Sequence, residues 1–154
     1  MVFSTLHTND APSAIGRMVQ MGLKPYLIAD SLIAVVAQRL VRKICSFCKE
    51  EIKPHQILLK RLEGKLPENP KFYAGKGCAK CNMTGYSGRI LISEILQVSE
   101  AVAKMIADGE SKYAIGKYAI ENENFEPMII DGLNKALQGL TTLDEILRVT
   151  KESR

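Results

Sequence analysis

The stretches Cys45-Ser46-Phe47-Cys48 and Cys78-Ala79-Lys80-Cys81 hold all four cysteines of this 154-residue chain. Each Cys-x-x-Cys turn directs two thiolates toward one point, and two such turns together supply the tetrahedral four-sulfur shell that Zn²⁺ accepts at about 2.3 Å. Four ligands close a structural site with no ligand left over. The spacing therefore predicts a structural zinc ion that holds residues 45–81 together as a metal module.

Other uses of the cysteines fit this pattern less well. Two disulfides would need an oxidising compartment and are usual in small secreted chains. A redox-active motif needs only one Cys-x-x-Cys pair, and an iron–sulfur cluster with four cysteines seldom has this spacing. Zinc binding is therefore the favoured role of the four cysteines. His55 lies inside the metal module without a fitting spacing and is interpreted as a surface residue.

The composition is that of an ordinary globular protein, with 46% hydrophobic and 25% charged residues. The longest apolar run, residues 32–37, is far shorter than the roughly 18 to 20 residues that cross a bilayer. The chain also opens without a basic segment followed by an apolar stretch. We therefore expect a cytoplasmic protein.

Positive charge gathers near the first cysteine pair, within a net charge of +4. The basic residues there are Arg39, Arg42, Lys43, Lys49 and Lys53. They are interpreted either as a solvated basic face or as a surface for an acidic or phosphate-bearing partner. Aromatic residues make up 6% of the chain and none is Trp, so nucleic acid is not an expected partner.

The hydrophobic pattern predicts an α/β fold whose first part is residues 1–44. Strands are expected over residues 2–6 and 38–44, and helices from Asp10 to Gly22 and from Pro25 to Val36. A strand that ends in polar residues before a helix is typical of the carboxyl edge of an α/β sheet, where ligands commonly bind. His7 lies in that polar run.

Three further parts follow along the chain. The metal module is expected to contain one helical patch over residues 56–62. Residues 82–98 hold the apolar run 90–96, which predicts a buried strand that returns to the sheet. Residues 99–154 are predicted to form a helical carboxyl-terminal subdomain, with N-caps at Ser99, Ser111 and Thr142 and stops at Gly109 and Gly139.

A phosphate-binding loop is missing from the sequence. The nearest candidate, Gly75-Lys76-Gly77, has Pro70 where the first glycine of the motif should stand. Gly77 stands where the motif needs a hydroxyl residue. We therefore expect that this chain alone neither binds ATP tightly nor hydrolyses it.

The segment Ser4-Thr5-Leu6-His7-Thr8-Asn9-Asp10-Ala11 resembles the histidine box of the bacterial secretion and pilus ATPases. Residues 37–42, the two cysteine pairs, and residues 85–89 with Glu94 follow in the order of that family. The combination is similar to the type II secretion ATPases and the type IV pilus assembly ATPases that carry a tetracysteine module. The resemblance spans nearly the whole chain and leaves secretion and pilus assembly both open.

The resemblance implies the carboxyl-terminal portion of a RecA-like core in an ATPase that forms homo-hexamers. Such an ATPase binds ATP and Mg²⁺ and works on an inner-membrane assembly platform. In the intact protein His7 would be catalytic, acting on the γ-phosphate or on an attacking water. Arg39 and Arg89 would bind the nucleotide or contact the neighbouring subunit, or would only pair with a carboxylate such as Glu94.

A second class of function stays open beside the ATPase. A zinc module without enzymatic activity could bind a protein or a nucleic acid, and it would use the same four cysteines. The two classes differ in what should lie upstream of the chain. The ATPase interpretation requires a phosphate-binding loop and a Walker B acid there, whereas the binding-module interpretation requires neither.

Overall fold

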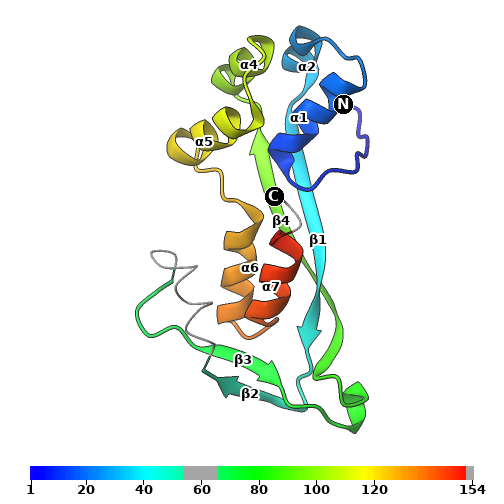
Figure 1. Cartoon of the computed structure of the whole chain (residues 1–154), viewed down its shortest axis with the longest axis vertical. Coiled ribbons are helices and arrows are strands. Elements are labelled where there is room, and N and C mark those ends of the chain that lie inside the picture. Colours follow the sequence, from blue (N-terminus) through cyan, green and yellow to red (C-terminus); the bar gives the residue numbers. More distant parts are fainter. Residues whose placement is uncertain (54–65, 152–154) are drawn as a thin grey trace. The chain divides into compact units, whose positions relative to one another are not determined.

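The computed structural model describes residues 1–53 and 66–151, and these residues divide into two compact units (Figure 1). Unit 1 comprises residues 1–38 and 93–128. Unit 2 comprises the described residues of 39–92 and 129–151. Each unit contains helices and strand residues, which confirms the mixed α/β class. The predicted helical patch over 56–62 lies outside the described residues.

The amino-terminal segment forms neither a helix nor a strand over residues 1–8, so the predicted strand over 2–6 is wrong in this structure. An apolar segment becomes a strand only where its backbone groups find a partner strand. Neither of the two sheets formed by the described residues includes this segment. The sequence pattern alone could not supply that partner.

Helix α1, Ala11–Gln20, confirms the helix predicted from Asp10. The Asp10 carboxylate accepts a hydrogen bond from the Ser13 N–H at 2.7 Å and so caps the helix. Gly22 follows with φ of 94°, a left-handed conformation that favours glycine after a helix end. Local signals therefore determine both ends of this helix.

Helix α2, Pro25–Ser31, is shorter than the predicted helix that was to reach Val36. Strand β1, Ala34–Ile44, begins where that helix was expected to continue. Ile33, Val35 and Val36 are β-branched, and such residues favour a strand where a partner is present. Strand β4, Tyr86–Gln97, is that partner. The strand predicted over 38–44 is confirmed and lengthened.

Strand β4 contains the apolar run that was predicted to be a buried strand, but only one of its faces is buried. Ile92, Glu94 and Leu96 are buried, whereas Leu91 and Ile95 are 42% and 55% exposed. Strand side chains alternate between the two faces, so an apolar run does not show whether both are covered. The strand is confirmed, and its complete burial is wrong.

Two further helices complete unit 1. Helices α4, Glu100–Ala107, and α5, Lys112–Asn122, begin after the predicted N-caps Ser99 and Ser111. The Ser99 hydroxyl accepts from the Val102 N–H and the Ser111 hydroxyl from the Ala114 N–H, both at 3.2 Å. Helix α2 packs on α4, and α1 packs on α5. The buried residues of these four helices include Ala11, Ala14, Ile15, Ile28, Val102, Ile106, Ile115 and Ala119.

Unit 2 combines a short hairpin-like pair of strands with two helices. Strands β2, Lys49–Ile52, and β3, Phe72–Gly75, are antiparallel. Helix α6, Met128–Leu137, begins at the unit boundary, and α7, Leu143–Lys151, follows it. A Cβ on Gly132 would lie 2.7 Å from the Ile146 side chain, so glycine allows the two helices to approach closely. The predicted carboxyl-terminal subdomain is not confirmed, because α4 and α5 fall in unit 1.

None of the described helices is long and apolar enough to cross a membrane.

The division of the chain into four parts, with boundaries after residues 44, 81 and 98, stays a prediction.

Candidate metal centre

The four cysteine sulfurs lie within 4.8 Å of one another. The Sγ···Sγ distance is 3.9 Å for Cys45 and Cys78, 3.9 Å for Cys48 and Cys81, and 3.7 Å for Cys78 and Cys81. A regular tetrahedral shell with metal–sulfur bonds of 2.3 Å places its sulfurs about 3.8 Å apart. A disulfide would need about 2.05 Å, and all four cysteines are free thiols. The donor set therefore fits a four-coordinate, thiolate-binding metal.

The first cysteine turn links the end of β1 to the start of β2. The Cys45 N–H donates to the Gly85 carbonyl at 2.9 Å, which joins this turn to the segment after the second turn. The Cys48 N–H donates to the Cys45 carbonyl at 3.3 Å. Both thiols are buried, with Cys45 only 1% exposed. Two strand ends thus place the two sulfurs.

The second cysteine turn contains the 3₁₀ helix η1, Ala79–Cys81, and two residues in the left-handed region. These are Asn82 and Met83, with φ of 50° and 61°. The Cys81 sulfur accepts from the Cys78 N–H at 3.2 Å and from the Gly85 N–H at 3.3 Å. Amide donors around a sulfur stabilise the thiolate form and orient it as a ligand. Two backbone amides therefore point at the Cys81 sulfur.

Glycine is required where the backbones of the module meet. A Cβ on Gly75 would overlap the carbonyl oxygen of Gly85, and a Cβ on Gly85 would overlap the carbonyl oxygen of Gly75. A Cβ on Gly77 would lie 2.7 Å from the Met83 carbonyl oxygen. Gly77 and Gly85 also have φ of 94° and 77°, which other residues rarely adopt. The two cysteine turns can approach only because these positions carry no side chain.

The thiols differ in acidity because their surroundings differ. Burial raises the pKa of Cys48 to about 12, and hydrogen bonds to the neighbouring sulfurs add to this effect. Burial also raises the pKa of Cys81, but the N–H groups of Cys78 and Gly85 outweigh it and lower the value to about 6. A bound dication favours the thiolate form of every ligand. Metal binding would therefore release protons from this cluster and depend on pH.

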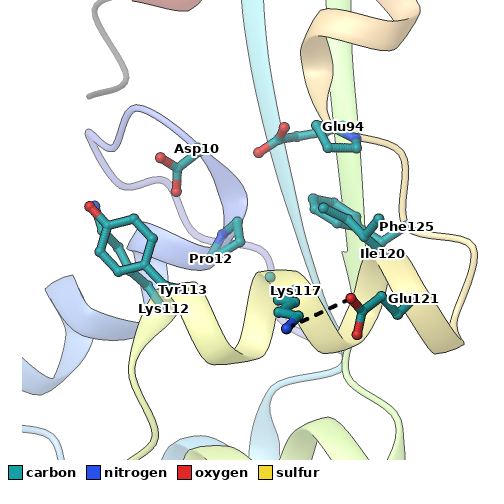
Figure 2. A pocket seen from close by; sticks show the side chains of 11 residues that line it. Asp10, Pro12, Glu94, Lys112, Tyr113, Lys117, Ile120, Glu121 and Phe125 are labelled. Carbon is teal, nitrogen blue, oxygen red and sulfur yellow. Dashed lines mark ion pairs between the residues drawn. The ribbon is translucent and has the colours of Figure 1, made fainter. Parts of the chain in front are cut away.

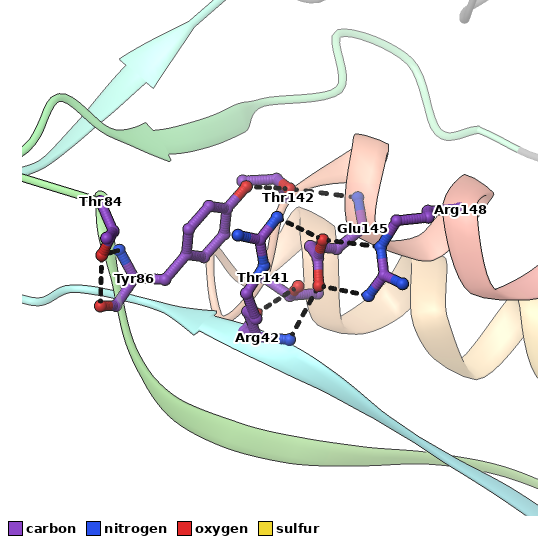
Figure 3. A network of polar contacts seen from close by, with 7 residues as sticks. All are labelled: Arg42, Thr84, Tyr86, Thr141, Thr142, Glu145 and Arg148. Carbon is purple, nitrogen blue, oxygen red and sulfur yellow. Dashed lines mark hydrogen bonds and ion pairs between the residues drawn. The ribbon is translucent and has the colours of Figure 1, made fainter.

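A second polar cluster lies in unit 2 around Glu145, as Figure 3 shows. The Glu145 carboxylate is 1% exposed and pairs with the Arg42 guanidinium at 2.7 Å and with the Arg148 guanidinium at 3.1 Å. The Arg42 guanidinium also lies 4.1 Å from the centre of the Tyr86 ring, and the Tyr86 hydroxyl contacts the Thr142 hydroxyl at 2.9 Å. Arg42 thus keeps a half-exposed side chain while its guanidinium pairs with a buried carboxylate of the same unit.

The N-cap predicted at Thr142 is present, but the Glu145 side chain does not return to the Thr142 backbone to complete a capping box. The Thr142 hydroxyl accepts the Glu145 N–H at 3.3 Å, whereas the Glu145 carboxylate binds the two arginines. Burial raises the pKa of Glu145, but the hydrogen bonds from Arg42 and Arg148 outweigh burial and lower it to about 2. The sequence could not reveal this pairing, because Arg42 and Glu145 are 103 positions apart.

A second buried carboxylate, that of Glu94, lies in unit 1. One Glu94 oxygen accepts from the Ala11 N–H at 2.6 Å, and the other accepts from the Met128 N–H at 2.7 Å. Burial and the nearby charge of Asp10 raise the pKa of Glu94, while the two amides oppose the shift. Burial is the largest of these effects. Glu94 was singled out only as a motif residue and possible arginine partner, and no sequence signal indicated its two amide contacts.

A cavity of about 530 Å³ lies in unit 1 beside Glu94. Figure 2 shows Asp10 and Pro12 from the start of α1 on one side and residues of α5 on the other. The Lys112 ammonium already donates to the Ser13 hydroxyl at 3.2 Å. The volume is in the range of small-molecule sites. The contacts of its charged side chains do not indicate a ligand class.

The other residues with predicted roles have the following positions. His7 is exposed in the segment without regular structure, and Arg89 is exposed on β4. Arg39 is partly buried on β1. The structure therefore brings the four cysteines together, while the roles of His7, Arg39 and Arg89 stay predictions.

Comparison with known proteins identifies the class. A family described as "Type II/IV secretion system protein" matches residues 1–148, and the chain belongs to this family. Among its curated relatives, the chain is 43% identical to a "Type IV pilus assembly ATPase PilB" from Thermus thermophilus. It is 42% identical to a "Type II secretion system ATPase E" from Vibrio cholerae. Both alignments cover 99% of the chain, which confirms the resemblance predicted from the sequence motifs.

The chain spans 17% of the length of the Thermus relative and 30% of the length of the Vibrio relative. It therefore corresponds to less than a third of these proteins.

Proposed function

We propose that this chain forms the carboxyl-terminal part of a cytoplasmic ATPase that powers type II secretion or type IV pilus assembly. The observation that carries the proposal is identity of 42–43% to two such ATPases across 99% of the chain. The proposal includes a RecA-like core, a homo-hexamer, ATP and Mg²⁺ as ligands, and attachment to the inner membrane through platform proteins. The chain itself, without a phosphate-binding loop, is expected to be inactive.

In this proposal three residues act on the nucleotide side. His7 would contact the γ-phosphate or the attacking water, because an imidazole can donate or accept a proton near neutral pH. Arg39 and Arg89 would contribute positive charge to the phosphates or to the neighbouring subunit. The exposure of His7 and Arg89 is compatible with this assignment, since exposed side chains are accessible to a nucleotide or to a neighbouring subunit.

The proposed metal is zinc, held by Cys45, Cys48, Cys78 and Cys81 in a closed structural site. Sulfur separations of 3.7–3.9 Å support four-coordinate binding. Four thiolates without an open position favour zinc in a structural role over a catalytic metal. The zinc would fix the two cysteine turns against each other and would leave phosphate chemistry to the ATPase core.

A chimera tests the enzymatic proposal. The segment of the Vibrio cholerae ATPase that aligns with this chain is replaced by the chain, and steady-state ATP hydrolysis and protein secretion are measured. We expect the chimera to hydrolyse ATP and the isolated chain to show no turnover. In the chimera, His7→Ala should lower kcat by about 10²-fold and leave KM within a few-fold, because the residue acts mainly on the transition state.

The matched control is His55→Ala in the same chimera, a histidine of the metal module without a proposed role in hydrolysis. Its kcat should equal that of the unsubstituted chimera. A folded chimera without ATPase activity, or equal kcat values in His7→Ala and the parent chimera, would contradict the proposal. The first outcome would favour the second class, a zinc-stabilised binding module, and the second outcome would remove the catalytic role of His7 alone.

A further inference from the structure

Glu94 is a buried carboxylate that the proposed chemistry does not use. It is 6% exposed on β4, and both of its oxygens accept backbone amides. Ala11, the donor to the first oxygen, is the first residue of α1. Met128, the donor to the second oxygen, is the first residue of α6. The first amides of a helix have no partner within the helix, so Glu94 satisfies one such group at each start.

Two hydrogen bonds and burial hold the start of α1. The Ala11 amide binds Glu94 at 2.6 Å, and the Asp10 carboxylate binds the Ser13 amide at 2.7 Å. Ala11 is fully buried, with 0% exposure. These contacts fix where the backbone emerges from the helix toward His7. Only residues 8–10 separate His7 from this fixed point.

We infer that Glu94 is a positioning residue that anchors the start of α1 and thereby sets the location of His7. This inference rests on the proposed role of His7 in ATP hydrolysis. A carboxylate is suited to the task because it has two acceptor oxygens and no donor, so it can bind two amides at once. Hydrogen bonds to an ionised group are also stronger than those between neutral groups.

The substitution Glu94→Gln tests whether the two acceptor oxygens of Glu94, and not merely the volume of its side chain, hold the start of α1. Glu94→Gln keeps the side-chain size but replaces one acceptor oxygen by an NH₂ donor. Only one of the two amides can then be accepted, and the other faces a donor. The matched control is Glu145→Gln, the same change at a carboxylate that is also buried but binds Arg42 and Arg148 in unit 2.

The first measurement uses the zinc-loaded chain itself, by amide hydrogen exchange and NMR. In Glu94→Gln, the exchange of the Ala11 or the Met128 amide should become about tenfold faster, and the His7 resonances should shift, because a hydrogen bond to a charged group is lost. In Glu145→Gln, these exchange rates and resonances should stay as in the parent chain. Unchanged exchange of both amides in Glu94→Gln would contradict the inference that Glu94 anchors α1. The same changes in exchange and resonances in Glu145→Gln would also contradict it.

The second measurement uses the chimera with the Vibrio cholerae ATPase. Glu94→Gln should lower kcat by about tenfold to a hundredfold while KM stays within a few-fold, because a small displacement of a group at the reacting atoms affects the transition state most. Glu145→Gln should retain kcat. Unchanged kcat in Glu94→Gln would overturn the positioning role. If the parent chimera is inactive, the proposed ATPase function has failed, and the exchange measurement still decides whether Glu94 anchors α1.

Discussion

The metal module and the Glu145 cluster are both buried polar groups of unit 2, but their charges are balanced by different means. The Glu145 carboxylate is neutralised by Arg42 and Arg148, two cations of the same chain. The four cysteine sulfurs form a cluster of their own, and a metal bound there would bring its compensating positive charge from solution. Folding of the first region should therefore depend on metal, and folding of the second should depend on pH.

The largest expected effect is that of metal removal. Structural zinc contributes on the order of 10 to 16 kcal/mol in finger peptides at neutral pH. That is as large as the whole net stability of about 5 to 15 kcal/mol that is usual for a domain. A chelator, or the substitution Cys45→Ser, should therefore increase hydrogen exchange strongly in the two cysteine turns. The amides of α1 and α4 in unit 1 should keep most of their protection.

The measurement is zinc content by elemental analysis together with residue-resolved hydrogen exchange. Ser46→Ala serves as the control, because Ser46 is exposed between the two ligands of the first turn and offers no sulfur. One zinc per chain is expected in the parent protein and in this control. A native chain without zinc that still protects the cysteine turns would contradict the assigned difference between the two regions.

The closeness of the cysteines within each pair could be predicted from the sequence because its signal is local. Cys45 and Cys48, like Cys78 and Cys81, are close enough in sequence for one turn to bring each pair together. The helix caps Asp10, Ser99 and Ser111 are local in the same sense, since each binds an amide three residues ahead. Such features need no knowledge of the rest of the fold.

The features that were missed depend on distant partners. The Glu94 contact with Ala11 spans 83 positions, and no periodicity reveals it. The apolar residues 32–36 fit a helix or a strand equally, and pairing of β1 with β4 decides between them. The segment 2–6 has the composition of a strand but no partner strand among the described residues. The RecA-like topology and the nucleotide-binding roles of His7, Arg39 and Arg89 also depend on distant partners, and they stay predictions.

A smaller effect is expected from the glycine contact inside the metal module. Gly75→Ala should destabilise the module by about 3 kcal/mol, because the new Cβ would overlap the Gly85 carbonyl oxygen and the backbone must shift. Zinc affinity should fall, as measured by competition with a chelator. Gly16→Ala is the matched control, since its Cβ would meet nothing within 4 Å on an exposed face of α1. Equal zinc affinity in Gly75→Ala and the parent would show that the module tolerates wider spacing.

The smallest expected effect concerns the Glu145 cluster and depends on pH. The folded-state pKa of Glu145, about 2, lies below its ordinary value of 4.5, so the ionised form is favoured in the folded state. Its stabilising contribution is complete above about pH 5 and is lost as pH falls toward 2. Because the two arginine side chains are 52% and 55% exposed, solvent weakens the pairs, and we expect about 1 to 2 kcal/mol.

The substitution Glu145→Gln should remove this pH-dependent contribution, so the free energy of unfolding of the parent and the variant should converge between pH 5 and pH 2. Urea unfolding at several pH values measures the difference between the two proteins, and the difference cancels any acid-induced loss of zinc that both share. The stability difference between the parent and Glu94→Gln should change with pH in the opposite direction. The pKa of Glu94 is raised in the folded state, so ionisation of this carboxyl group lowers the free energy of unfolding of the parent as pH rises. A parent–Glu145→Gln difference that is constant with pH would show that the arginines contribute packing alone, and the contrast between a metal-dependent and a proton-dependent region would fail.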